Sequence, residues 1–231
     1  MGSCVDCCDV ARRTRRRNQH RGAVQTPPEE AFEVEPADEV DGEEPEEAEE
    51  AELDPEVAAR RTAALARIRK FGDPVLRTRA RSVERFDEAL ATEVEHMGRL
   101  MGDALGVGLA ATQVGVLHRV LVYRVGPEGP VAALVNPEVE WKGRETETLE
   151  EGCLSLPGVL LDVDRPVHVR VRGRDQHGEG ILVEASGLEA LVIQHEIDHL
   201  DGVLILDRAS REARKEAMRA LREADRAHEA A

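Results

Sequence analysis

Apolar residues recur at helical spacing in two segments before the middle of the chain. Residues 87–104 carry apolar side chains three or four positions apart, as a helix with one buried face requires, at Leu90, Val94, Met97, Leu100 and Met101. Residues 57–68 show a shorter pattern of the same kind, which ends before Gly72 and the Asp-Pro pair that follows it. We therefore expect a short helix at 57–68 and a longer amphipathic helix at 87–104.

Two further helices are predicted near the C-terminus. An apolar run occupies much of residues 188–200, and Gly202 follows it as a residue that commonly ends helices. Ser186 and Glu189 stand three positions apart, which is the spacing of a capping box at a helix start. Residues 209–229 are rich in Ala, Arg and Glu, which favour a helix exposed to solvent. The first of these helices should be buried and the second exposed.

Short apolar runs in the middle of the chain predict β-strands. They are separated by Gly, Pro and Asp residues and occupy residues 119–125, 131–139, 145–149, 167–173 and 180–185. The connections between them are too short for helical crossovers, so neighbouring strands should pair antiparallel. The expected fold class is α+β, with one central helix packed on antiparallel strands.

The charge of the chain is concentrated in its first quarter. Residues 1–21 are basic, whereas residues 29–56 hold sixteen Asp and Glu and no Lys or Arg. The rest of the chain has 31 acidic and 31 basic residues, so this one segment accounts for the net charge of −16. Segments of one charge with little apolar surface do not bury enough to fold. We predict a disordered N-terminal extension at 1–56 and one folded domain at 57–231, the latter including the helix at 209–229.

Composition excludes several classes of partner. Aromatic residues make up 2% of the chain, which leaves few side chains to stack on bases, so direct reading of nucleic acid is not expected. No apolar run reaches about eighteen residues, and no membrane attachment is expected. Cys4, Cys7 and Cys8 crowd together while Cys153 stands alone, which is not the framework of a disulfide-stapled secreted domain. A reducing, cytoplasmic location is expected.

The sequence His195-Glu196-Ile197-Asp198-His199 is the strongest chemical signal. Residues four apart share one face of a helix, so both imidazoles can reach one metal ion while Glu196 stands beside the first of them. A third ligand is needed. Cys153 is one candidate; the other candidates are carboxylates of the C-terminal helix, as in a thermolysin-like peptidase, at Glu212, Glu216 and Glu223. Spacing alone leaves both sources open.

Three separate segments resemble the signature motifs of the peptide deformylase family. They are Gly106–Gln113, Glu151–Ser155 and Gln194–Gly202, in the family's order and at similar separations. Gly72–Arg77 is also similar to the family, so that the resemblance covers roughly residues 65–208. It implies a peptide-deformylase-like fold, in which antiparallel β-sheets pack around a central metal-binding helix and a C-terminal helix follows.

The resemblance also implies an activity and a cofactor. Members of the family remove the formyl group from the N-terminal N-formylmethionine of nascent polypeptides and release formate. By this resemblance Cys153, His195 and His199 would bind one divalent metal ion per chain, with Fe2+ expected and Zn2+, Ni2+ or Co2+ able to replace it. The expected partners are N-formylmethionyl peptides, nascent chains and the ribosome. The alternative function is that of an HExxH metallopeptidase.

Roles for further residues follow from the same resemblance. Glu196 would act as the catalytic base, and the oxyanion would be bound by the side-chain amide of Gln113 and the backbone N–H of Leu154. A pocket for the methionine side chain and backbone would be formed by Val107, Gly108, Leu149, Gly152, Leu188, Leu191 and Val192.

Three positions qualify the resemblance. Leu105 replaces a commonly acidic residue, and Leu160 stands where many relatives carry Arg, so substrate preference should differ. Arg165 is retained, either in a structural ion pair or as a surface charge.

Overall fold

The computed structural model of this protein describes residues 53–126 and 129–229. Most of the predicted extension, residues 1–52, lies outside the described residues. The first helix begins at Pro55, where the side chain of Asp54 accepts a hydrogen bond of 2.8 Å from the backbone N–H of Glu56. The expected boundary at residue 57 therefore falls within the first turn of a helix. The division into an extension and a catalytic domain stays a prediction.

The helices of the described residues include the four expected ones. They are α1 (Pro55–Leu65), α2 (Glu88–Asp103), α3 (Gly187–Leu200), the short α4 (Ile205–Arg208) and α5 (Arg211–Glu229), with 3-10 turns η1 (Pro74–Arg77) and η2 (Ala111–Val114). No helix among the residues that the structure describes is long and apolar enough to cross a membrane.

The strands form two antiparallel sheets. Their bounds are β1 (Gly108–Ala110), β2 (Val120–Tyr123), β3 (Ala132–Lys142), β4 (Thr146–Cys153), β5 (Leu156–Pro166), β6 (His168–Arg174) and β7 (Gly180–Ser186). The larger sheet has the order β1-β2-β3-β6-β7, and β4 pairs with β5 in a separate two-stranded ribbon. The expected α+β class with antiparallel sheets is confirmed.

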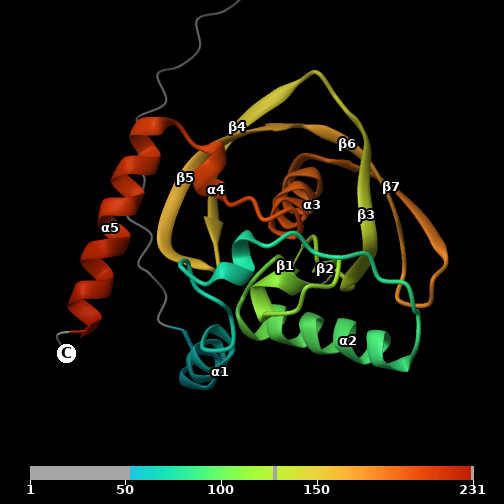
Figure 1. The fold of residues 1–231 in the computed structure, drawn as a ribbon, viewed down its shortest axis with the longest axis horizontal. Coiled ribbons are helices and arrows are strands. Elements are labelled where there is room, and N and C mark those ends of the chain that lie inside the picture. The colour runs from blue at the N-terminus through green and yellow to red at the C-terminus, as the bar shows by residue number, and fades with distance from the viewer. Residues whose placement is uncertain (1–52, 127–128, 230–231) are drawn as a thin grey trace, which may run out of the picture. The chain divides into compact units, whose positions relative to one another are not determined.

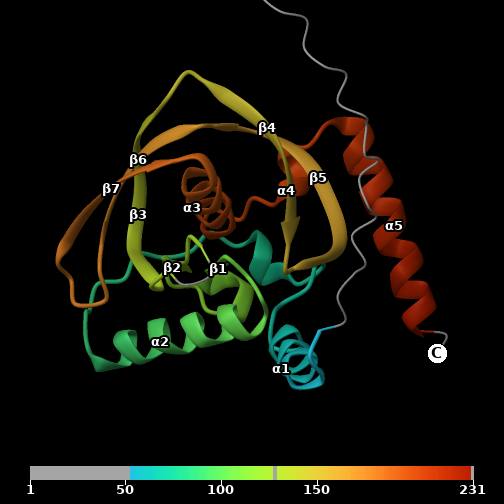
Figure 2. The same cartoon turned by 180° about the vertical axis from the view of Figure 1, so that it is seen from behind.

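The helix α3 lies at the centre of these layers. It contacts β1, β2, β6 and β7 of the larger sheet as well as β5 of the ribbon, and Figures 1 and 2 show it enclosed by strands. Nine consecutive residues of α3, from Val192 to Leu200, are therefore shielded from water. The helix α2 covers the other side of β1 and β2, while α5 lies outside the ribbon against β5. This buried part of α3 can hold ionisable side chains whose properties depend on exclusion of water.

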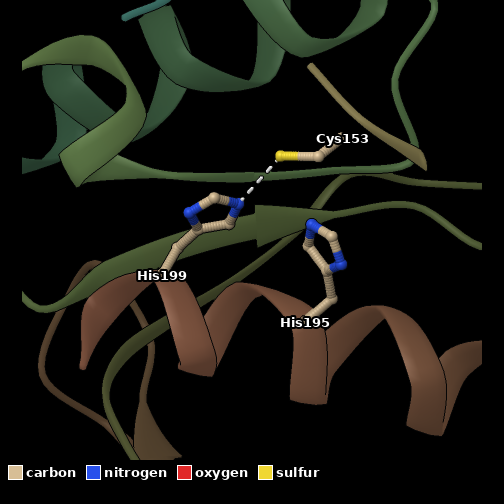
Figure 3. Close-up of side chains that lie close together, drawn as sticks. All are labelled: Cys153, His195 and His199. Carbon is tan, nitrogen blue, oxygen red and sulfur yellow. Dashed lines mark hydrogen bonds between the residues drawn. The ribbon is translucent and has the colours of Figure 1, made fainter. Parts of the chain in front are cut away.

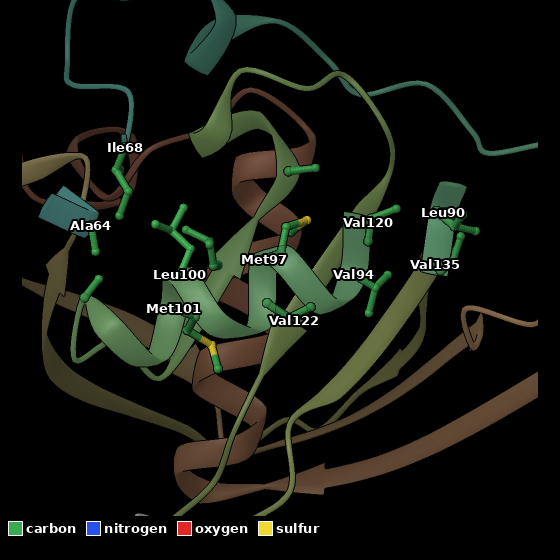
Figure 4. Close-up of a cluster of buried hydrophobic side chains, with 13 residues drawn as sticks. Ala64, Ile68, Leu90, Val94, Met97, Leu100, Met101, Val120, Val122 and Val135 are labelled. Carbon is green, nitrogen blue, oxygen red and sulfur yellow. The ribbon is translucent and has the colours of Figure 1, made fainter. Parts of the chain in front are cut away.

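The helix α2 shows how the apolar pattern determines packing. Asp87 caps its start, because its side chain accepts a hydrogen bond of 3.2 Å from the N–H of Leu90. Met97 and Met101 are fully buried, and they pack with Val120 and Val122 in the cluster drawn in Figure 4. Each such side chain contributes about 1.5–3 kcal/mol through burial. This cluster packs α2 against β1 and β2, and these strands in turn contact α3.

Strand β5 was not predicted from the sequence. Its buried positions alternate, at Val159, Leu161, Val163 and Arg165, as a half-buried strand requires. The pattern was obscured because an apolar residue, Leu160, faces solvent and a charged residue, Arg165, faces inward. The three-residue β1 was missed as well, since so short a strand has no period to detect.

The predicted capping box at the start of α3 is wrong. Ser186 is the N-cap residue, but its side chain makes no capping hydrogen bond. Glu189 instead accepts a hydrogen bond of 3.1 Å from the hydroxyl of Tyr123 on β2. A tertiary partner has therefore replaced the local one. The end of the helix agrees with expectation: Gly202 has φ +75°, and a Cβ there would lie 2.7 Å from the carbonyl oxygen of Arg77.

Candidate active site

Cys153, His195 and His199 meet beside the central helix. Their potential ligand atoms all lie within 4.8 Å of one another, and Sγ of Cys153 is 3.2 Å from Nε2 of His199. The two imidazole rings have centroids 5.0 Å apart and are inclined by 63°. Figure 3 shows both rings rising from one face of α3 toward the cysteine. Cys153, which precedes His195 by 42 positions, thus lies beside two histidines that are one helical turn apart, as the family resemblance implied.

The ribbon places the cysteine. Cys153 is the last residue of β4, and it pairs with Leu156 across a turn made of Leu154 and Ser155. A bulge between Gly152 and Cys153 shifts the register at this end of the ribbon, which turns the cysteine toward α3. Burial alone would raise the pKa of the thiol, but the neighbouring imidazoles of His199 and His195 outweigh it. The pKa of Cys153 therefore lies well below its usual value, which favours the thiolate that metals bind.

The donor set fits a divalent transition metal ion. One thiolate sulfur and two imidazole nitrogens suit Fe2+, Zn2+, Ni2+ or Co2+, and three protein ligands leave a position open for catalysis. The alternative ligands do not join the cluster, because Glu212, Glu216 and Glu223 are exposed on α5. The third donor beside the histidines is thus Cys153.

Charged side chains contact His195 on the side of the ring that faces away from the cluster. Its Nδ1 lies 2.8 Å from Oε2 of Glu151, which leaves Nε2 for the cluster. Arg165 donates to both carboxylate oxygens of Glu151, at 2.6 and 2.9 Å, and also to Asp198 at 2.7 Å. Asp198 in turn accepts hydrogen bonds from Arg208 of α4, at 2.5 and 3.0 Å. These contacts orient the imidazole of His195 and its tautomer.

The two readings of Arg165 are now resolved in favour of a buried ion pair. Only 5% of Arg165 and 3% of Glu151 are exposed. Burial opposes ionisation of Glu151, but the hydrogen bonds from Arg165 and His195 lower its pKa to about 2. Because each charge is paired, the cost of burying it is offset.

Glu196 faces the cluster with one unpaired oxygen. It is 4% exposed, and its Oε2 has no hydrogen-bond partner among the described residues. Burial raises the pKa of Glu196, although the charges of His195 and His199 oppose the shift. Gly108 makes room for this carboxylate, because a Cβ there would lie 2.4 Å from Oε1 of Glu196. An acceptor that is buried and unpaired beside potential metal ligands is well suited to hold a proton.

Gln113 and Leu154 stand on the other side of the cluster. Oε1 of Gln113 accepts a hydrogen bond of 2.8 Å from the N–H of Ala110, so the amide nitrogen points the opposite way. That nitrogen lies 3.8 Å from Sγ of Cys153 and 3.4 Å from Oγ of Ser155. Leu154 follows Cys153 directly in the turn of the ribbon. Both predicted oxyanion donors are therefore close to the cysteine.

A pocket of about 570 Å³ opens next to the cluster and is lined by His195, Glu196, Cys153 and Gln113. All the predicted substrate-binding residues also line it, namely Val107, Gly108, Leu149, Gly152, Leu188, Leu191 and Val192. Leu105 and Leu160, the two departures from the family pattern, belong to the same lining and are more than half exposed. The structure thus brings the predicted site residues to this cavity except His199, which is buried behind it in contact with Cys153.

Some residues around the site were not predicted. Asp198 was seen only as part of the histidine motif, and Glu151 only as part of its own motif, yet both belong to the ion-paired support of His195. Arg208 was not singled out at all. The sequence did hint at this support, because acidic residues buried within metal-ligand motifs need cationic partners. It did not indicate which arginines would be those partners.

The fold and the site together define a metallohydrolase with one Cys-His-His metal centre in an α+β domain. A sequence model of the polypeptide deformylase family matches residues 65–215. The peptide deformylase of Thermotoga neapolitana is 51% identical over 144 residues, which is 62% of this chain and 87% of that protein. The peptide deformylase of Acidothermus cellulolyticus is 48% identical over 162 residues, which is 70% of this chain and 88% of that protein. The chain belongs to the polypeptide deformylase family.

Solved structures agree with this assignment. A peptide deformylase from Synechococcus elongatus in complex with actinonin has 41% identity and a TM-score of 0.64, over 66% of this chain and 85% of that one. The peptide deformylase of Thermotoga maritima has 47% identity and a TM-score of 0.60, and the match covers 62% of this chain and 97% of that one. The expected fold is confirmed, and the alternative of an HExxH metallopeptidase is not supported.

Proposed function

We propose that this chain removes the formyl group from the N-terminal N-formylmethionine of nascent polypeptides and releases formate. The observation that carries the proposal is the convergence of Cys153, His195 and His199 with Glu196 beside one apolar pocket. The relatives that share this chain's family are named peptide deformylases.

In this proposal Cys153, His195 and His199 hold one divalent ion. Ferrous iron is the proposed native metal, because the family resemblance implies it, and Zn2+, Ni2+ or Co2+ would fit the same donors. When bound, the cation supplies Lewis-acid chemistry, which polarises a carbonyl group and makes water more acidic.

Glu196 is the proposed proton carrier. Its unpaired Oε2 would accept a proton from the attacking water and later deliver it to the departing amine of methionine. Burial raises the pKa of this carboxyl, which brings it closer to the value that both accepting and donating a proton near neutral pH require.

Gln113 and Leu154 are the proposed donors to the oxyanion. The hydrogen bond from Ala110 fixes the Gln113 amide, so its N–H groups need no reorganisation when negative charge develops on the formyl oxygen. The N–H of Leu154 would approach the same oxygen from the turn of the ribbon.

The pocket is the proposed site for the methionine side chain. Leu149, Leu191 and Val192 supply apolar surface, while Val107 and Leu188 are half-exposed at its mouth. Gly152 lets the substrate backbone run close to β4, because it presents no side chain there.

The proposed setting follows from the substrate. Nascent chains emerge from the ribosome, so we place the reaction beside it in the cytoplasm, where reducing conditions preserve the thiol of Cys153. Nucleic acid and membrane have no part in the proposed reaction. Residues 57–231 would form the catalytic domain, and the charged extension at 1–56 would not take part in the chemistry.

Formate release from formyl-Met-Ala by protein loaded anaerobically with Fe2+ or Ni2+ tests the proposal. Glu196→Gln should reduce kcat by about 10²–10⁴-fold, the usual contribution of a positioned acid–base group, while metal content and melting temperature change little. Glu189→Gln is the matched control on the same helix and should retain turnover. Absence of formate release by the metal-loaded wild-type protein would contradict the proposal.

A further inference from the structure

Three consecutive residues link the two sides of the proposed oxyanion site. The backbone N–H of Arg69 donates to the carbonyl of Gln113 at 2.8 Å, and that of Phe71 donates to the carbonyl of Ser155 at 2.9 Å. Between them, Nζ of Lys70 donates to the carbonyl of Leu154 at 3.0 Å. One short segment therefore contacts both the 3-10 turn η2 and the turn of the β4–β5 ribbon.

The Lys70 contact differs from the other two because it comes from a charged side chain. Lys70 is partly buried, and no carboxylate among the described residues forms an ion pair with it. Burial lowers the pKa of Lys70, while the negative charge of Cys153 opposes that shift. An ammonium group placed without a carboxylate partner near a thiolate adds positive potential to that region.

The contact acts on a peptide that the ribbon alone does not hold. Leu154 and Ser155 lie in the turn between β4 and β5, outside the ladder of the two strands. The contacts of Lys70 with the Leu154 carbonyl and of Phe71 with the Ser155 carbonyl restrict how the two peptides of this turn can rotate. The N–H of Leu154, one of the two proposed oxyanion donors, belongs to the peptide just before these two and is joined to the first of them at the Cα of Leu154. Holding the Leu154 carbonyl therefore limits the backbone dihedral angles of Leu154 that aim this N–H.

We infer that Lys70 is a positioning residue for deformylation, whose ammonium group holds the Leu154 turn in the orientation that binds the developing oxyanion. The inference rests on the proposed function. Substrate binding should depend little on Lys70, because Lys70 is not among the residues that line the pocket. Its effect should therefore fall on kcat and leave KM nearly unchanged, as for interactions that matter mainly in the transition state.

Lys70→Met tests the inference, because it keeps the length of the side chain and removes the charge and the donor. We expect kcat for formyl-Met-Ala to fall about tenfold, which is less than the loss of a direct oxyanion donor, with KM and metal content within about twofold of wild type. Lys70→Arg retains a charged donor and should restore most of the activity. Lys142→Met removes an exposed lysine from β3 and is the matched control.

Hydrogen exchange supplies a readout that does not require turnover. The amides of Leu154 and Ser155 should exchange faster in Lys70→Met than in wild type or Lys70→Arg. An unchanged kcat in Lys70→Met, with normal formate release by the wild-type enzyme, would overturn the inference alone. A loss of activity that Lys70→Arg fails to restore, or that accompanies loss of metal, would also overturn it. A wild-type protein that releases no formate would overturn the proposed function itself.

Discussion

The two histidines of α3 stand one helical turn apart but have different surroundings. His195 belongs to a chain of ion pairs, because its Nδ1 contacts Glu151, which is held by Arg165. His199 is 1% exposed, and its Nδ1 has no hydrogen-bond partner among the described residues. Near His199 the structure offers a neutral contact instead, from the hydroxyl of Thr112 to the His199 carbonyl at 3.2 Å.

The two histidines are therefore held in position for metal binding in two different ways. On the His195 side, orientation depends on buried charges that are costly when left unpaired. On the His199 side, orientation depends on the backbone of the buried C-terminal part of α3 and on close packing, which is less sensitive to the loss of any one side chain. Substitutions on the two sides should therefore differ greatly in their effects.

The largest effect is expected for Arg165→Met. This change leaves Glu151 and Asp198 buried without their shared cation, which should cost about 3–5 kcal/mol of unfolding free energy. Metal affinity should fall about 10–100-fold, because the support of His195 is lost. Urea unfolding and metal titration measure the two quantities.

Arg172→Met is the matched control for that variant. Arg172 pairs with Glu138 on the surface, where both side chains are more than 60% exposed. Because water screens such pairs, the unfolding free energy should change far less than in Arg165→Met. Equal losses in the two variants would contradict the importance assigned to the buried pairs.

A smaller effect is expected for Thr112→Val on the His199 side. The His199 carbonyl keeps its hydrogen bond from the N–H of Gly202, so the free energy of unfolding should fall by only about 1 kcal/mol. Metal affinity should stay close to that of the wild-type protein. A tenfold loss of affinity, measured by the same titration, would show that both histidines depend on side-chain support.

The smallest effect at neutral pH is expected at the start of α3, away from both histidines. Burial, with smaller contributions from the charge of Glu189 and from its hydrogen bond, raises the pKa of Tyr123 to about 12. The folded protein therefore keeps this proton where the unfolded chain, with a pKa near 10, loses it. The resulting stability is complete below pH 10 and is lost as the pH rises toward 12.

Tyr123 is the only tyrosine of the chain, so tyrosinate absorbance reports its titration directly. Tyr123→Phe should remove this part of the pH dependence and change the unfolding free energy at pH 7 by about 1 kcal/mol or less. A titration midpoint near pH 10 in the folded protein would refute the assigned contact.

The helices were the most predictable part of the fold. Val94, Met97 and Met101 recur at the helical period, and α2 forms with these residues buried, as that period requires. Strand β5 was not predictable, because its inward position 165 is an arginine and its outward position 160 is a leucine. Both choices make sense only in the folded protein, where Arg165 meets Glu151 and Leu160 borders the pocket.

By itself, the sequence indicated the family, the two histidines and the carboxylate between them, because their spacing is imposed by the helix that carries them. Tertiary structure decided the rest of the site: that Cys153 and not an acidic residue of α5 joins the histidines, that Asp198 and Arg208 extend the support of His195, and that Lys70 reaches the Leu154 turn. Side chains on one face of a helix recur at a fixed spacing, so their proximity can be predicted from the sequence. Contacts between distant segments depend on strand register, on bulges and on which charges burial forces into pairs.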